Sequence, residues 1–189
     1  DGNAFRILTV RNPNPREDFV NTEVMYDNIM NKFHFRNLDD PNVYYTQDYR
    51  NFAQNHRSSM NTLATALLDK GDKEKARKVL LKNLEEIPDK AIRYDLTNST
   101  MVSLLFQVGE DDNAMEIAET MGERSIEMLD YLIRNNSDIG LNLQMNLFIL
   151  GELQRSLSAN GRDELAKKYE EAYNRKIGRA PRLNSSHVK

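Results

Sequence analysis

The chain has a long stretch in which apolar residues recur three and four positions apart, the spacing of one face of an α-helix. Five such faces follow one another between residues 46 and 175. They comprise Met60, Leu63 and Leu67; Ala76, Val79, Leu80 and Leu84; Met101, Leu104, Leu105 and Val108; Ile117, Met121, Met128 and Leu132; and Leu143, Leu147, Leu150 and Leu157. This stretch has few glycines and a single proline, Pro88. The pattern therefore predicts an all-α domain over residues 46–175.

The first 45 residues follow a different pattern. Residues 4–10 alternate loosely and are rich in β-formers, which predicts one short strand. A short helix is expected over residues 22–33, with Thr22 as its N-cap. Residues 35–45 have no period and predict an irregular connector. We therefore expect an N-terminal arm, a short helix and a connector before the helical domain.

A glycine followed five positions later by an alanine occurs three times between apolar helices. The pairs are Gly71 and Ala76, Gly109 and Ala114, and Gly161 and Ala166. Glycine accepts the left-handed conformation that ends a helix. Asp72 or Asp111 is then expected to cap the following helix and to favour its positive end. The alanine, one turn further on, allows two helices to approach closely.

These positions resemble the tetratricopeptide repeat, a motif of about 34 residues that forms a helix pair. The first unit matches at Leu63, Ala64, Leu67, Gly71, Ala76, Leu80 and Pro88; the second at Val102, Leu105, Gly109, Ala114 and Ala118; the third at Leu150, Leu157, Gly161 and Ala166. The resemblance departs at Met60, where the motif has a large aromatic residue, and the glycines are 38 and 52 residues apart. It implies an all-α, degenerate tetratricopeptide-like helix-pair array with a short N-terminal extended arm. A generic helical bundle is the alternative.

Composition removes several classes of function. With 26 Lys+Arg against 29 Asp+Glu, the net charge of −3 offers no attraction for nucleic acid or an anionic membrane. The absence of Cys excludes disulfides, thiolate catalysis and Cys-based zinc sites. The longest uncharged runs, residues 96–109 and 139–151, are too short for a span of roughly 20 residues. We therefore expect no nucleic-acid partner and no membrane span within this chain.

The sequence contains no recognisable catalytic or metal-binding motif. None of His34, His56 and His187 has a metal-type partner three or four positions away, and no phosphate-binding loop occurs. The acidic runs at residues 39–40 and 110–112 lack the alternation of a calcium loop. The methionines are expected to fill the core, with copper binding as the less favoured alternative. We therefore expect no catalytic, cofactor-binding or metal-binding residue, and no cofactor.

Six aromatic residues are concentrated in a stretch of 20, which is the least ordinary local feature of the chain. They are Phe33, Phe35, Tyr44, Tyr45, Tyr49 and Phe52. Such density can form a sugar-stacking platform or the rim of a peptide site. The favoured interpretation is that they pack the connector on the first repeat helix and cover the end of the array. Three arginines near them, Arg36, Arg50 and Arg57, are expected to pair with Asp39, Asp40 or Asp48.

A second resemblance covers residues 1–175. The segments GNAFR at residues 2–6, EVMYDN at 23–28 and DPNVY at 40–44, in this order before a helical repeat, resemble the C-terminal region of an uncharacterised bacterial membrane protein family. That family has a multi-spanning N-terminal part similar to protein O-mannosyltransferases. The resemblance implies that this chain is a fragment, a soluble tail of a parent in the bacterial inner membrane, on the periplasmic side. It also implies that any transferase chemistry lies upstream.

The chain is thus expected to comprise an arm and connector (1–45), a helical repeat domain (46–175) and a tail (176–189). The tail breaks from the helical pattern and resembles translated vector or adaptor sequence, with a flexible basic tail as the alternative. The favoured function is a non-catalytic accessory or interaction domain. It would bind a protein or peptide partner, or the parent's own membrane domain. A free-standing interaction module unrelated to glycosyl transfer is the alternative, and an enzyme in its own right is the least favoured.

Overall fold

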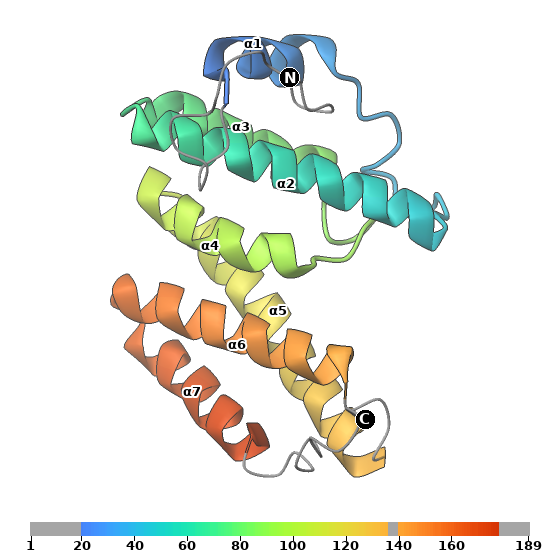
Figure 1. Ribbon diagram of the computed structural model, residues 1–189, viewed down its shortest axis with the longest axis vertical. Coiled ribbons are helices and arrows are strands. Elements are labelled where there is room, and N and C mark those ends of the chain that lie inside the picture. Colours follow the sequence, from blue (N-terminus) through green and yellow to red (C-terminus); the bar gives the residue numbers. More distant parts are fainter. Residues whose placement is uncertain (1–19, 136–139, 178–189) are drawn as a thin grey trace, which may run out of the picture. The chain divides into compact units, whose positions relative to one another are not determined.

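The computed structural model describes residues 20–135 and 140–177 (Figure 1). Helices occupy most of these residues, and no strand occurs among them. In chain order they are α1 (Thr22–Asp27), the π-helix η1 (Asn28–Lys32), α2 (Gln47–Asp69), α3 (Lys73–Glu86), α4 (Leu96–Val108), α5 (Asp111–Asn135), α6 (Leu141–Ala159) and α7 (Asp163–Ile177). The predicted all-α fold is confirmed. The strand expected over residues 4–10 lies outside the described residues, as does the tail from residue 178.

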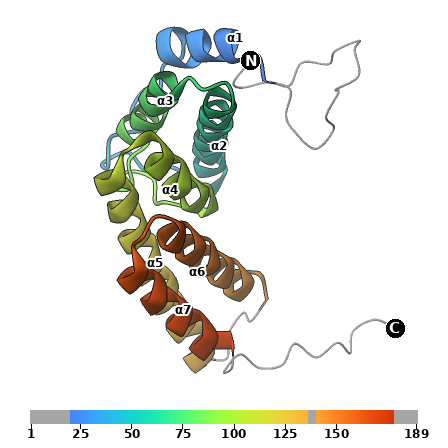
Figure 2. The same ribbon diagram turned by 90° about the vertical axis from the view of Figure 1, so that its left-hand side faces the viewer.

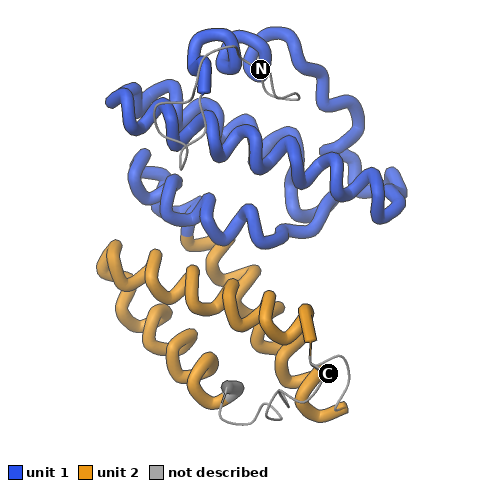
Figure 3. Tube along the Cα trace, in the orientation of Figure 1, with its two compact units in different colours: residues 1–114 blue, residues 115–189 orange. Residues whose placement is uncertain are grey.

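The chain divides into two compact units, residues 1–114 and residues 115–189 (Figure 3). The first contains α1, η1, α2, α3 and α4 with the first turn of α5. The second contains the rest of α5 with α6 and α7. The division therefore falls within α5, and the short helices of the N-terminal region belong to the same unit as α2–α4.

In the first unit α2 and α3 form a pair, and α4 packs against both (Figures 1 and 2). The predicted apolar faces of these helices form its core. Its buried members include Met60, Leu63, Leu67, Ala76, Val79, Leu80, Met101 and Leu105. Leu84 is half-buried rather than buried. Burial of these side chains is the main favourable term in the stability of the unit.

The short helix begins as predicted at residue 22, but its cap is different. The side chain of Asn21, not Thr22, accepts a hydrogen bond from the amide of Val24, at 3.2 Å. Thr22 is buried, and its hydroxyl oxygen accepts a hydrogen bond from Lys70 Nζ at 2.8 Å. The expectation that Thr22 is the N-cap was wrong, because its side chain is instead hydrogen-bonded to Lys70 at the end of α2.

The three glycine turns have the same backbone geometry. Gly71, Gly109 and Gly161 have φ values of 79°, 83° and 70°, in the left-handed region. After each glycine, the next amide donates to the carbonyl five residues before it, at 2.9 Å in all three turns. These bonds satisfy carbonyl groups at the helix ends, as in a Schellman motif. The predicted role of the glycines is confirmed.

The predicted caps after the glycines are confirmed in one case. Asp72 is the N-cap of α3, and its side chain accepts from the amide of Lys75 at 3.1 Å. Asp111 is not a cap, because it is already the first residue of α5. The residue equivalent to Asp72 in the second turn is Glu110, whose carboxylate bonds to Arg77 and Asn113.

Replacing Gly71 with valine should lower stability by about 1–2 kcal/mol or somewhat more, since a β-branched residue resists positive φ. A Cβ at this position would meet no heavy atom within 4 Å, so backbone strain is the whole effect. Gly71→Asn is the matched control, because asparagine tolerates this conformation. Urea unfolding of the two variants measures the difference. Equal stabilities would contradict the left-handed turn.

The second unit is organised around a buried tyrosine of α7. Tyr169 is fully buried, and its hydroxyl donates to the carbonyl oxygen of Ala118 on α5, at 2.9 Å. Its ring lies against Gly122, where an added Cβ would be 2.1 Å from the ring carbon that carries the hydroxyl. Burial raises the pKa of Tyr169, and the charges of Glu123 and Glu119 add to the effect. Tyr169 therefore stays neutral and fixes α7 on α5.

The remaining core of the second unit follows the predicted faces with one exception. Its buried members include Ile117, Met121, Leu132, Leu143, Leu147, Leu150 and Leu157. Met128 was expected to share the α5 face, but nearly half of its surface is exposed. Leu129, one position later, is buried in its stead.

Candidate functional site

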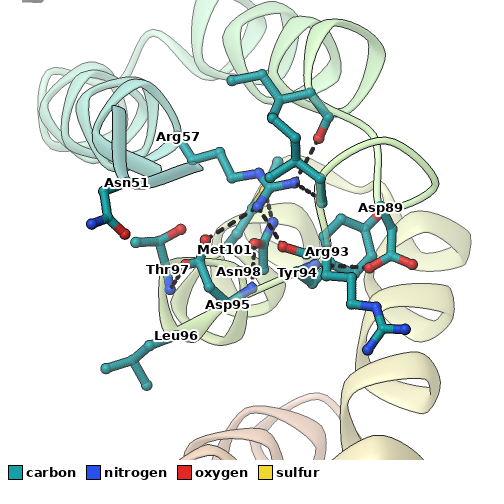
Figure 4. Close-up of polar contacts among 12 residues, drawn as sticks. Asn51, Arg57, Asp89, Arg93, Tyr94, Asp95, Leu96, Thr97, Asn98 and Met101 are labelled. Atoms are coloured by element: carbon teal, nitrogen blue, oxygen red, sulfur yellow. Dashed lines mark hydrogen bonds and ion pairs between the residues drawn. The ribbon is translucent and has the colours of Figure 1, made fainter. Parts of the chain in front are cut away.

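The most buried charged group in the described residues is the guanidinium of Arg57, on α2 (Figure 4). Its side chain is 0% exposed. Nη1 donates to the carbonyl oxygen of Arg93 at 2.9 Å and to Asp95 Oδ2 at 3.1 Å. Nη2 donates to the carbonyl oxygens of Ile87, at 2.9 Å, and Ile92. We call Arg57 and these four partners the arginine centre.

The arginine centre organises the connector between α3 and α4. Residues 87–95 are not helical, so their carbonyl groups need other partners when buried. Arg57 supplies four hydrogen bonds from one planar group, which a lysine could not do. Asp95 is also the N-cap of α4: its Oδ1 accepts from the amide of Thr97 at 2.7 Å, within a capping box completed by Asn98. One carboxylate thus joins α2 to the start of α4.

Two asparagines extend this network among the helices of the first unit. Asn83 of α3 donates to the carbonyl oxygen of Arg57 at 3.3 Å and to Asn61 Oδ1 at 3.2 Å. Asn61 in turn donates to the carbonyl oxygen of Thr97 at 2.8 Å. Buried polar groups that are hydrogen-bonded in this way specify one packing arrangement of α2, α3 and α4.

Burial lowers the pKa of Arg57, and the opposing charge and hydrogen bond of Asp95 partly restore it. An arginine nevertheless remains protonated at any physiological pH. The guanidinium also lies 5.6 Å from the centroid of the Tyr94 ring. Its Nη1 and Nη2 donors are directed at backbone carbonyls and one carboxylate of the same chain, whereas the buried Nε has no hydrogen-bond partner among the described residues. The arrangement stabilises the fold and presents no proton donor or nucleophile to a substrate.

The ion pairs expected near the aromatic cluster are wrong for two of its three arginines. Arg57 pairs with Asp95 instead of Asp39, Asp40 or Asp48, which sequence distance had favoured. Arg50 donates from Nε to the carbonyl oxygen of Tyr45 at 3.1 Å, and its guanidinium lies 5.9 Å from the Tyr44 ring centroid. Arg36 lines a shallow hollow with Asp39.

Part of the aromatic cluster packs the connector on the first helix pair, as predicted. Phe35 is buried and makes edge contacts with Phe33 and His56, at ring-centroid distances of 6.4 and 5.4 Å. Tyr45 donates from its hydroxyl to the carbonyl oxygen of Asn37 at 2.8 Å. Asn37 has a φ of 62°, a conformation that asparagine tolerates better than most residues.

The other three aromatic residues are exposed, so the expectation that they cover the end of the array was wrong for them. Tyr44, Tyr49 and Phe52 are 82%, 62% and 64% exposed. We call them the aromatic surface. Tyr49 and Phe52 are three residues apart on α2, and Phe52 is one turn before His56. Phe35 contacts α2 through the ring of His56. Phe52, one helical turn before His56, is exposed.

Stability should fall as the pH drops below about 6.5 because of His56. Burial lowers the pKa of this half-buried side chain, so the folded state favours neutral imidazole. The unfolded chain then binds the proton first, and stability falls between the ordinary pKa of 6.5 and the lower folded value. The melting temperatures at about pH 7.5 and about pH 5.5 should differ less for the His56→Gln variant than for the parent chain. An unchanged difference would contradict this assignment.

A shallow, open hollow lies beside the buried end of the cluster. It is lined by Phe33 and Phe35 and by charged side chains that include Lys82 and Glu86. Lys82 bonds to Glu86 at 2.7 Å and lies 5.7 Å from the Phe35 ring centroid. Its charge is therefore already paired. Within residues 20–135 and 140–177, no three His, Asp or Glu side chains gather in a way that could hold a metal ion.

The second unit has its own exposed apolar surface, which the sequence did not reveal. Leu141, Met145 and Phe148 on α6 are 70%, 38% and 49% exposed. They are four and three residues apart, so they share one face of the helix. We call them the α6 stripe.

Comparison of the chain with family models, curated proteins and solved structures finds no match. Among the helices that the structure describes, none is both long enough and apolar enough to cross a membrane.

Proposed function

We propose that this chain is a non-catalytic helical domain that binds a protein or peptide partner through its aromatic surface. The observation that carries the proposal is the exposure of Tyr44, Tyr49 and Phe52 on one end of α2 and the connector before it. Exposed aromatic side chains next to an arginine are typical of the residues that dominate binding energy at protein interfaces. Arg50, over the Tyr44 ring, supplies that arginine here.

The arginine centre supports the non-catalytic part of the proposal. It is the place in the first unit where charged groups are most removed from water, and such places are where perturbed catalytic groups are usually found. Here the two terminal nitrogens of the guanidinium bond to backbone carbonyls and to Asp95, the cap of α4. The buried charged group that could have served in catalysis, the Arg57 guanidinium, therefore holds the connector between α3 and α4 in place.

We further propose that the domain belongs to a longer membrane protein of glycosyltransferase type and faces the periplasm. The resemblance of residues 2–6, 23–28 and 40–44 to the family described above supports this assignment. The partner would then be the parent's own membrane domain or a protein beside it. An alkaline phosphatase fusion to the full-length parent after Arg175 tests the side of the membrane. Activity supports the periplasm, and fluorescence from a cytoplasm-only reporter at the same position contradicts it.

Peptide arrays that cover the water-exposed loops of the parent test binding itself. The chain should bind one or a few peptides, and Tyr49→Ser with Phe52→Ser should weaken that binding at least about tenfold. The matched control is Met128→Ser with Tyr131→Ser, an exposed apolar pair with the same spacing on α5. Equal loss in both double variants, or no loss in either, would contradict the assignment of the aromatic surface. Glycosyl transfer by the chain alone would contradict the non-catalytic role.

A further inference from the structure

The aromatic surface lies on a part of α2 that the neighbouring helices do not reach. α2 has 23 residues, whereas α3 and α4 have 14 and 13, and the start of α2 extends beyond both of them (Figure 1). Residues 47–52 are all exposed, and the first buried residue of the helix is Ala53. The polar side chains of this end of α2 are therefore as open to a partner as the aromatic ones.

One of these polar side chains, Arg50, is held in position by its own chain. Its Nε donates to the carbonyl oxygen of Tyr45 at 3.1 Å, and its guanidinium carbon lies 5.9 Å from the centroid of the Tyr44 ring. An arginine side chain loses rotamer freedom when it binds, and one that is already held loses less of it. Arg50 is therefore pre-organised for a contact.

The two terminal nitrogens of Arg50 have no hydrogen-bond or ion-pair partner in the part of the chain that the structure describes. Asp48 is two positions before Arg50, so it points to another side of the helix. Asp40 instead accepts hydrogen bonds from the backbone amide and the side chain of Asn42, at 2.9 and 3.0 Å. Arg50 thus presents two N–H donors and a positive charge beside exposed aromatic rings.

We propose that the partner segment carries an acidic side chain, Asp or Glu, whose carboxylate pairs end-on with both terminal nitrogens of Arg50. Apolar side chains next to that acid would cover Tyr49 and Phe52. A planar guanidinium matches the two oxygens of a carboxylate. A wholly apolar partner would remove the Arg50 charge from water without a counter-charge, which is costly. This partner chemistry rests on the function proposed above and adds to it.

A library of random peptides displayed on phage, selected against the full chain, tests this chemistry. Peptides that bind the parent more tightly than the Tyr49→Ser, Phe52→Ser double variant should contain Asp or Glu next to apolar residues. Replacing that acid by its amide in a selected peptide should raise the dissociation constant at least about fivefold.

The outcomes separate this proposal from the function on which it rests. Amide copies that bind as tightly as the acidic peptides overturn the proposed acidic contact and leave the aromatic surface as a binding site. Selection of no peptide, or of peptides that bind the parent and the double variant equally, overturns both.

Variants of Arg50 test whether this side chain makes the contact. Arg50→Gln should weaken binding of the acidic peptide by the same factor as the amide change, and should hardly affect the amide copy, because both changes remove one interaction. Arg50→Lys should restore only part of the binding, since an ammonium cannot form two parallel bonds to a carboxylate.

Arg93→Gln is the matched control, because it removes the same charge from an exposed side chain of the connector between α3 and α4. It should leave the dissociation constant of the acidic peptide unchanged. Equal weakening by Arg93→Gln and Arg50→Gln would show a general charge effect and overturn the proposal. Full binding by Arg50→Gln overturns it as well, and full binding by Arg50→Lys overturns the end-on pairing.

Discussion

Arg57→Met is expected to destabilise the first unit by about 3–5 kcal/mol, the usual cost of removing one member of a buried ion pair. The variant keeps an apolar stem of similar size but leaves the carbonyls of Ile87, Ile92 and Arg93 without their donor. Each buried acceptor left without a partner costs about 1–3 kcal/mol before relaxation. Asp95, partly exposed, would be hydrated and would contribute less to the loss.

Chemical denaturation of the full chain measures this effect. Arg93→Met is the matched control, because the same change is made on an exposed side chain of the same connector. It should alter stability by no more than about 0.5 kcal/mol. Arg57→Lys should recover little, since one ammonium cannot reproduce the bonds of a planar guanidinium. Equal stability of Arg57→Met and Arg93→Met would show that the arginine centre does not hold the connector.

Gly122→Ala is expected to destabilise the second unit by about 3 kcal/mol, although alanine is the better helix former. The added Cβ would lie 2.1–2.6 Å from three atoms of the Tyr169 side chain, so α5 and α7 must separate or the ring must move. Movement of the ring also weakens the bond from the Tyr169 hydroxyl to Ala118.

Gly151→Ala on α6 is the matched control, since its Cβ would meet nothing closer than Tyr173 at 4.0 Å. It should be neutral or stabilising by up to about 1 kcal/mol. In a Tyr169→Leu background, Gly122→Ala should cost much less, and the coupling measures the contact directly. Destabilisation by both glycine variants to the same extent would contradict close packing at Gly122.

The elements that the sequence predicts correctly are those decided by neighbouring residues. The apolar period gives the helices, and the three glycines fall at their ends because a left-handed cap is a local requirement. Where the prediction of a helix cap is wrong, the error is a shift of one position along the chain. Thr22 and Asp111, for example, are each one residue inside the helix that they were expected to cap.

The arginine centre could not be predicted, because its contacts join residues 30 to 38 positions apart. In the sequence, Arg57, Asn61 and Asn83 look like solvent-exposed polar residues of their helices. The only available signal is positional. Arg57 and Asn61 follow Ala53 at intervals of four, which places them on the buried face of α2. Gly122 and Tyr169 are 47 residues apart and gave no local signal either.

The aromatic cluster shows where density along the sequence is a poor guide to burial. Six residues within one stretch suggested a common role, but the turn at Asn37 brings only part of them onto α2. Phe35 reaches His56 and ends the covered part of the helix. Tyr49 and Phe52 stay exposed because no described residue covers the part of α2 that precedes His56.

The central proposal is that the aromatic surface binds a protein partner, and cross-linking in the full-length parent tests it most directly. A photo-reactive phenylalanine analogue is placed at Phe52 in one variant and at Tyr131 in a control, and the adducts are mapped by mass spectrometry. We predict an adduct from position 52 to a defined segment of the parent's membrane domain or of one neighbouring protein, and none from position 131. Position 52 giving no adduct, or the same adducts as position 131, would contradict the proposal.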